Sequence, residues 1–407
     1  MDQTAASQVG NAAHDQTQIF GLLGGLLILA FFANRVSRRT RVPDIVILTV
    51  TGVVLGPLLG WIHAGEYPVF TEYLGTFALI LILFEAGNEL HLREAMRNFP
   101  AGVLFAFLAY GMSFAAVAWI GFWALQLPLH QALLLGGVFG CTSGTIVIPV
   151  LQQFGIQGPV TVVLVLEAAL GDVIAVILVG GLADIPEGNP LAGLVTGILV
   201  RTAVAIGAAI AAGVLWSRER SRFTSDRFGS VLHVGAVLLV YGLVRAAGGS
   251  GLMAVLAFGL TLANVNTAAE RNETAPRQGF LVFHSDLSFL VRSFFFVLLG
   301  ASVQLIGRTY AVATALILAG LVVARILSVY AAGWAMRGVS RSGRELILSL
   351  FPRGLVNAVL AIQVAGKESG MAYLPAMAFT VILVTNLLVV LAAVRLRPLM
   401  AASAEHP

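Results

Sequence analysis

The chain has 407 residues, of which 58% are hydrophobic and 11% are charged, and its formal net charge is +4. Because a soluble domain carries about 25% charged residues, this composition excludes a soluble globular protein and indicates one that spans a membrane many times. The basic residues lie in short loops between apolar stretches, which argues against binding to nucleic acid. The single cysteine, Cys141, excludes a disulfide framework and a metal site with several cysteine ligands.

Apolar stretches of bilayer-spanning length follow one another along the chain. Because unsatisfied backbone polar groups are intolerable in hydrocarbon, a stretch of about 20 apolar residues crosses a bilayer as a helix. We therefore predict an all-α polytopic membrane protein with about thirteen transmembrane helices. They cover residues 17–34, 42–62, 72–90, 99–126, 130–153, 157–182, 190–216, 228–247, 249–266, 280–305, 309–336, 343–365 and 372–394.

Basic residues are divided unevenly between the loops on the two sides. If the N-terminus lies outside, the inside loops contain 17 arginines and the outside loops only 3 basic residues, which is the bias of the positive-inside rule. We predict an external N-terminus and a cytoplasmic C-terminus, in a bacterial inner membrane. Four arginines fall within predicted helices, where they must snorkel, line a cavity or pair with an acid: Arg201, Arg292, Arg325 and Arg353. Arg201 and Arg292 have no obvious acidic partner in sequence, and we expect them to snorkel.

Two predicted helices are interrupted by glycine, proline and polar residues. The fifth is interrupted at Thr142–Thr145 and the twelfth at Pro352–Gly354, and Thr142 and Arg353 are 211 residues apart. The first and eighth helices also begin 211 residues apart. This spacing predicts two inverted six-helix repeats joined by a linker helix, with crossing discontinuous helices 5 and 12. Paired interrupted helices in two halves of a transporter indicate a binding site near the membrane midplane.

The sixth predicted helix contains two acids, Glu167 and Asp172, within its apolar sequence. An acid at membrane depth is costly and indicates a function. Because burial disfavours the charged form, Asp172 is suited to bind either a proton or a monovalent cation, and their competition suffices for antiport. Thr142 and Ser143 would add hydroxyl oxygens, which hard cations prefer as ligands. Two simpler interpretations stay open: Asp172 pairs with an intramembrane arginine, or the small polar residues serve close helix packing.

For Glu167 we prefer a structural role. It precedes Asp172 by five residues, which places the two side chains about 140° apart around a helix, too far apart to share one ion easily. We expect Glu167 to face another helix and to pair with an intramembrane arginine, for which Arg325 and Arg353 are both candidates. Glu85, near the inside end of the third predicted helix, either lines an entrance funnel or makes a helix-end contact, and we prefer the helix-end contact.

Five segments together resemble the cation/proton antiporter superfamily, and in particular its sodium/proton exchanger branch. In chain order they are RVPDIVILTVTGVVLGP (41–57), LEAALGD (166–172), SFFFVLLGASV (293–303), ARILSVY (324–330) and FPRGLVNAVLA (351–361). The resemblance extends over nearly the whole chain. Each segment alone is moderately specific, whereas their order and spacing together are strongly specific.

The resemblance implies a homodimer in which a core subdomain moves like an elevator against a dimerisation subdomain. It assigns residues 1–98 and 190–306, with the linker helix, to dimerisation, and residues 99–189 and 307–398 to the ion-translocating core. It also assigns roles to four side chains, namely ion binding to Asp172 and a supporting ion pair to Glu167 with Arg325 and with Arg353.

The sequence departs from the family pattern at two places. Gly171 stands where this branch has an asparagine before the ion-binding aspartate, and Ser143 and Gly144 stand where a Thr-Asp-Pro motif has its Asp and Pro. These departures leave the choice among lithium, sodium and potassium open. In the resembled family, two adjacent aspartates accompany electrogenic exchange, so the presence of Asp172 alone predicts electroneutral exchange.

The sequence therefore predicts a secondary antiporter that exchanges a monovalent cation (Na⁺, or K⁺ or Li⁺) for H⁺ and uses no cofactor. Its expected partners are the lipid bilayer, a second copy of the chain and the transported cations. Two alternatives are a monovalent cation channel, although no filter motif is present, and an organic-anion symporter, which would need basic groups at both interruptions. A membrane enzyme is disfavoured, since the sequence contains no nucleophile–base constellation.

Overall fold

The computed structural model describes residues 21, 24–37, 39–40, 42–62, 68–89, 100–153, 156, 158–183, 190–223, 229–265, 275–302, 308–336 and 339–404. All regular structure in these ranges is helical. The first half contains helix Gly24–Ser37, α2 (Asp44–Val53) with a π-helical turn η1 (Val54–Leu58), α3 (Pro68–Glu89), α5 (Pro100–Ala124), α6 (Leu129–Gly140), α7 (Gly144–Gln153) and α8 (Pro159–Leu182). The second half contains α9 (Pro190–Phe223), α10 (Gly229–Ala246), α11 (Gly251–Val265), α12 (Ala275–Ala301), α13 (Arg308–Ala331), α14 (Arg341–Ser349), α15 (Leu355–Lys367), the short η4 (Ser369–Met371) and α16 (Leu374–Ala404).

The helices have the lengths and compositions of a polytopic membrane protein. Within the described residues, six helices are long and apolar enough to cross a membrane, and six further apolar helical stretches are shorter. Each predicted span contains described helical residues, although parts of several spans, such as residues 17–20 and 22–23 of the first, lie outside the described residues. Two helices run past their predicted ends, to Phe223 in α9 and to Ala404 in α16. Both helices continue past the apolar stretch through segments that contain arginines, which the apolar pattern does not count.

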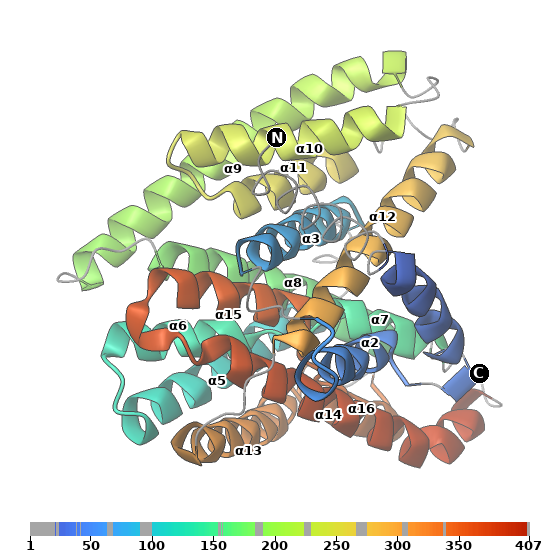
Figure 1. Ribbon diagram of the computed structural model, residues 1–407, viewed down its shortest axis with the longest axis vertical. Coiled ribbons are helices and arrows are strands. Elements are labelled where there is room, and N and C mark those ends of the chain that lie inside the picture. Colours follow the sequence, from blue (N-terminus) through green and yellow to red (C-terminus); the bar gives the residue numbers. More distant parts are fainter. Residues whose placement is uncertain are drawn as a thin grey trace, which may run out of the picture.

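The helices pack in two groups. Helices α9, α10 and α11 lie together at one end of the molecule, where α11 packs on α3, and α12 packs on α2 and α3 (Figure 1). Helices α5, α6, α7, α8 and α13 pack on one another towards the other end, joined there by α14, α15 and α16. Contacts of α15 with α3 and of α8 with α9 and α11 connect the two groups.

Helices α2 and α12 approach so closely that their backbones touch. A Cβ atom added at Gly52 would lie 2.1 Å from the carbonyl oxygen of Val297, and one added at Gly300 would lie 2.2 Å from that of Thr49. Small residues at both positions are the usual means by which membrane helices pack backbone to backbone. The glycines thus fix the distance between α2 and α12.

Replacing Gly300 by alanine tests this contact. The added methyl group meets backbone atoms, so the helices must separate, and overpacking of this kind costs about 1–3 kcal/mol. We expect the midpoint of thermal unfolding, measured on purified protein in detergent, to fall. Gly242→Ala in α10 is the matched control, because a Cβ there meets nothing within 4 Å and alanine favours a helix over glycine. An equal response of the two variants would contradict the close-packing account.

Candidate functional site

Both predicted helix interruptions are present. Helix α6 ends at Gly140, the backbone continues extended from Cys141, and α7 begins at Gly144. Helix α14 ends at Ser349, and α15 begins at Leu355 after five non-helical residues. Each pair of half-helices therefore exposes backbone carbonyl and amide groups in the interior of the helix bundle.

The two interruptions touch each other. The backbone amide of Ser143 donates to the carbonyl oxygen of Pro352 at 2.9 Å. A Cβ atom at Gly354 would lie only 2.1 Å from the hydroxyl oxygen of Ser143, so the crossing requires glycine at that position. The two interrupted segments cross where Ser143 meets Pro352 and Gly354. The crossing brings residues more than 200 positions apart in sequence into one site.

Arg353 fills the crossing and binds the open end of α6. It is 1% exposed; its Nε donates to the carbonyl oxygen of Phe139 at 2.9 Å, and its Nη1 donates to the hydroxyl of Thr142 at 3.3 Å and to the carbonyl oxygen of Phe351 at 3.0 Å. The last carbonyls of a helix lack intrahelical partners and carry a partial negative charge. The buried guanidinium of Arg353 supplies hydrogen-bond donors to these carbonyls and a positive charge that offsets their partial negative charge.

Asn357 also connects the two interrupted helices, and the sequence analysis did not predict this role. Its Nδ2 donates to the carbonyl oxygen of Val138 at 2.7 Å, and its Oδ1 accepts from the amide of Gly354 at 2.8 Å. One side chain therefore binds the end of α6 and caps the beginning of α15. The sequence does contain a signal for this role, because Asn357 stands three residues after a helix-breaking glycine at the start of an apolar helix. A polar side chain at this third helical position commonly accepts a hydrogen bond from the N-cap amide.

Glu167 pairs with Arg325 and lies 2% exposed in the core, while Arg325 is 4% exposed. The guanidinium donates to Glu167 Oε1 through Nη1, to the carbonyl oxygen of Ile347 at 2.9 Å and to that of Leu350 at 2.6 Å. The hydroxyl of Thr142 donates to the same Glu167 oxygen at 2.8 Å. Of the two candidate partners, Arg325 therefore contacts Glu167 directly. Arg353 reaches Glu167 only through the hydroxyl of Thr142.

Asp172 lies on α8 beside the crossing and is 5% exposed. Its Oδ1 is buried and has no hydrogen-bond partner in the part of the chain that the structure describes. The described ion pairs leave Asp172 without an arginine at ion-pair distance. Among the residues that the structure describes, Asp172 therefore does not form the direct arginine pair of the simpler interpretation.

The hydroxyls of Thr142 and Ser143, which were expected to bind the ion together with Asp172, bind other side chains instead. Thr142 is engaged by Glu167 and by the arginine of the crossing, and the Ser143 hydroxyl shares a hydrogen bond of 2.9 Å with that of Thr145. Both residues belong to the interruption that faces Asp172, but their hydroxyl groups bind other residues.

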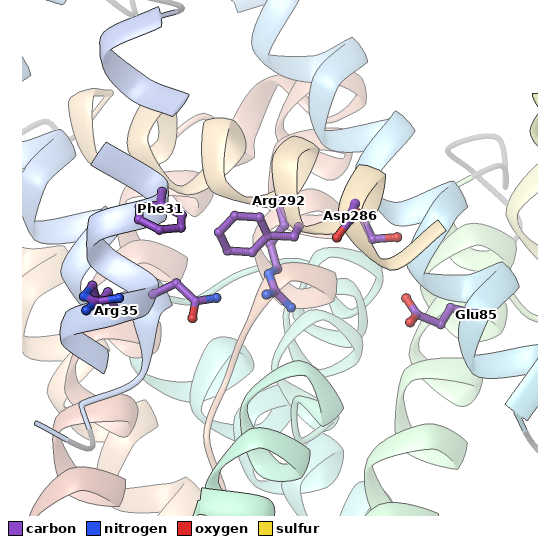
Figure 2. Close-up of a pocket in the computed structure, with 8 residues that line it drawn as sticks. Phe31, Arg35, Glu85, Asp286 and Arg292 are labelled. Carbon is purple, nitrogen blue, oxygen red and sulfur yellow. The ribbon is translucent and has the colours of Figure 1, made fainter. Parts of the chain in front are cut away.

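A polar cavity of about 500 Å³ lies away from the crossing, between helix Gly24–Ser37, α3 and α12 (Figure 2). Its walls contain Phe31, Asn34, Arg35, Glu85, Asp286, Ser288, Phe289 and Arg292. Arg292 contributes to the wall and contacts Asp44, with 3.4 Å between Nη2 and Oδ2. The expectation that Arg292 only snorkels is therefore wrong: its acid lies 248 residues away in sequence. Glu85 lines a cavity rather than only a helix end, and the side chain of Arg201 lies outside the described residues.

Glu167→Gln tests the structural role of the buried pair. The change leaves Arg325 without its counter-charge, and breaking such a pair costs about 3–5 kcal/mol, so the thermal unfolding midpoint in detergent should fall. In a double-mutant cycle with Arg325→Gln, the double variant should lose less than the sum of the two single losses. Additive losses, or an unchanged midpoint together with lost transport, would contradict the pairing as the role of Glu167.

Comparisons with known proteins agree with this architecture. The family model described as "Sodium/hydrogen exchanger, transmembrane" matches residues 26–402. The chain is 26% identical over 365 residues to Na⁺/H⁺ antiporter 1 of Methanocaldococcus jannaschii, which covers 84% of this chain and 82% of that protein. It is 25% identical to the K⁺/H⁺ antiporter NhaP of Alkalimonas amylolytica, over 69% of this chain and 48% of that one.

A solved structure has the same fold. The sodium proton antiporter MjNhaP1 from Methanocaldococcus jannaschii, determined at pH 8, superposes with a TM-score of 0.72 at 24% identity, over 93% of this chain and 95% of that one. With the family model matching nearly the full length, the chain belongs to the sodium/hydrogen exchanger family, whose members are secondary transporters and not enzymes.

Proposed function

We propose that this protein exchanges one monovalent cation for one proton at Asp172. The names of its relatives, sodium/proton and potassium/proton antiporters, support cation/proton exchange as the activity. The observation that carries the assignment to Asp172 is its carboxylate, buried beside the crossing of two broken helices, with one oxygen that finds no partner among the described residues. Glu167, the other acid of α8, also has one oxygen without a partner among the described residues, but its other oxygen is bound by Arg325 and Thr142.

An unpaired buried carboxylate is unstable unless something neutralises it. Burying a charge without a partner is strongly unfavourable, and such a group either takes a proton or finds a counter-ion. A proton and a small cation satisfy the same requirement and exclude each other at one carboxylate. Asp172 is thus occupied by one or the other, and this exclusivity is what couples the two fluxes.

The charges around the site support electroneutral exchange. Two buried arginines, Arg325 and Arg353, face two buried acids, Glu167 and Asp172. With Asp172 ionised the cluster is neutral, and it carries one positive charge whether Asp172 holds a proton or a monovalent cation. The loaded site therefore has the same charge in both directions of transport, and the membrane potential does no work on a full cycle.

Sodium is the cation that we propose first, with potassium and lithium as alternatives. The Thr142 and Ser143 positions contribute the backbone oxygens of an unwound segment and hydroxyls that can rearrange toward an ion, and oxygen ligands suit all three cations. Because Ser143 replaces an aspartate and Gly171 an asparagine of the family pattern, the site contains fewer strong oxygen ligands than that pattern has. No resident cofactor is part of this proposal.

Alternating access is proposed to occur by an elevator movement within a homodimer. The packing in two groups supports a core of residues 99–189 and 307–398 that moves against residues 1–98 and 190–306. The two crossing interruptions support an inverted repeat within about thirteen transmembrane helices. The distribution of arginines between loops supports an external N-terminus and a cytoplasmic C-terminus in a bacterial inner membrane.

Asp172→Asn tests the assignment. The amide keeps the shape of the side chain but can neither release a proton nor neutralise a cation, so cation/proton exchange in proteoliposomes should be lost while the protein stays folded. Glu345→Gln on α14, an acid outside the crossing, is the matched control and should retain exchange. Robust pH-driven cation flux through folded Asp172→Asn protein would refute Asp172 as the exchange site.

A further inference from the structure

Cys141 is the first residue of the interruption between α6 and α7 and is 1% exposed. It is the only cysteine of the chain. The Nδ2 of Asn357 lies 3.3 Å from its Sγ and 3.4 Å from its carbonyl oxygen. The thiol is therefore held in a fixed position at the crossing, by a side chain that also binds the end of α6.

Cys141 packs against α8 at Gly171, the residue that precedes Asp172. Helix α8 comes close to the interruption at Gly171, where an added Cβ atom would lie 3.4 Å from the Cβ of Cys141 and 3.8 Å from the amide nitrogen of Thr142. Asp172 is the next residue of α8 after Gly171, and its Oδ1 is buried without a partner among the described residues. An ion bound to this carboxylate would have the Cys141 sulfur as a neighbour.

Sulfur and oxygen differ as neighbours of a cation. Alkali cations are hard and are held by oxygen, whereas sulfur is a soft ligand that selects soft metals. Dehydration costs most for the smallest cations, so Li⁺ and Na⁺ depend more than K⁺ on strong oxygen ligands. A thiol in place of a hydroxyl therefore weakens the binding of Li⁺ and Na⁺ more than that of K⁺.

We propose that Cys141 is a specificity-determining residue of the exchange site. Its sulfur faces the cation on Asp172 and reduces the preference of the site for small, strongly hydrated cations relative to potassium. This inference rests on the proposed function, since it assumes that the cation binds at Asp172. It adds a residue that the family resemblance does not assign and states which way that residue shifts the choice of cation.

The test is a pair of substitutions at Cys141. In proteoliposomes, one measures the concentrations of Li⁺, Na⁺ and K⁺ that half-saturate exchange or, for a cation that is not carried, that half-inhibit exchange of the others. Cys141→Ser puts oxygen where sulfur was. The half-saturating or half-inhibiting concentrations of Li⁺ and Na⁺ should then fall several-fold relative to that of K⁺. Cys141→Ala removes the heteroatom and should keep the wild-type ratio. Unchanged ratios in Cys141→Ser, or an equal shift in both variants, would overturn the proposal.

A measurement on the unmodified protein covers the case in which a variant does not fold. The thallous ion is close to potassium in size but much softer, so it reports on sulfur rather than on cavity size. Thallous ion should compete for the wild-type site at several-fold lower concentration than potassium, and equal potency of the two ions would contradict a sulfur neighbour. Absence of exchange with every cation in the wild type would instead refute the proposed function, and this inference with it.

Discussion

Two interrupted helices cross inside this protein, and the open ends that result must be satisfied without water. In a bilayer each unpaired backbone group is strongly unfavourable, so non-helical backbone at membrane depth persists only where protein groups bind it. Here the groups are polar side chains. Arg353 and Asn357, from the second half of the chain, bind the end of α6 in the first half. Arg325 on α13 binds the carbonyl oxygens of Ile347 and Leu350 at the end of α14. The remaining structure holds these side chains in place.

This arrangement explains why so many charges are buried together. The two arginines that bind the open helix ends bring two positive charges into the core, where Glu167 and Asp172 are also buried. Glu167 is bound on one oxygen by Arg325 and by Thr142. Asp172 Oδ1 has no such partner among the described residues, so we propose that an exchanging proton or cation compensates its charge. The proposed chemistry thus follows from a structural requirement.

The crossing also ties distant parts of the core into one body. The bond from Ser143 to Pro352 joins the two interruptions, and the bond from Asn357 to Val138 joins α15 to α6. Bonds that hold the two halves of the core together are what the proposed elevator movement requires. The close backbone contact of α2 with α12 has the corresponding role in that second group.

Local patterns in the sequence were sufficient for much of the fold. Apolar length located the helices, and glycine, proline and polar residues located both interruptions, because these features act on their immediate neighbours. Pairing between distant residues was harder to infer. The contact of Arg292 with Asp44 joins residues 248 apart, and nothing local to either indicates the other.

The details of the site show the same limit. Thr142 was predicted from its hydroxyl alone, and only the fold reveals that Glu167 and Arg353 already bind that hydroxyl. Asn357 has a local signal as a helix cap, but its bond to Val138 depends on the crossing of two helices. The choice of Arg325 over Arg353 as the direct partner of Glu167 likewise depends on tertiary geometry, which the sequence left open.

The measurement that most directly tests the account is proton movement in proteoliposomes containing the wild-type protein, with lithium, sodium and potassium offered in turn and the membrane potential either free or clamped. Exchange of one cation for one proton at a single carboxylate predicts proton movement that requires a cation and proceeds at the same rate in both conditions. Cation current without coupled proton movement would contradict it and favour a channel.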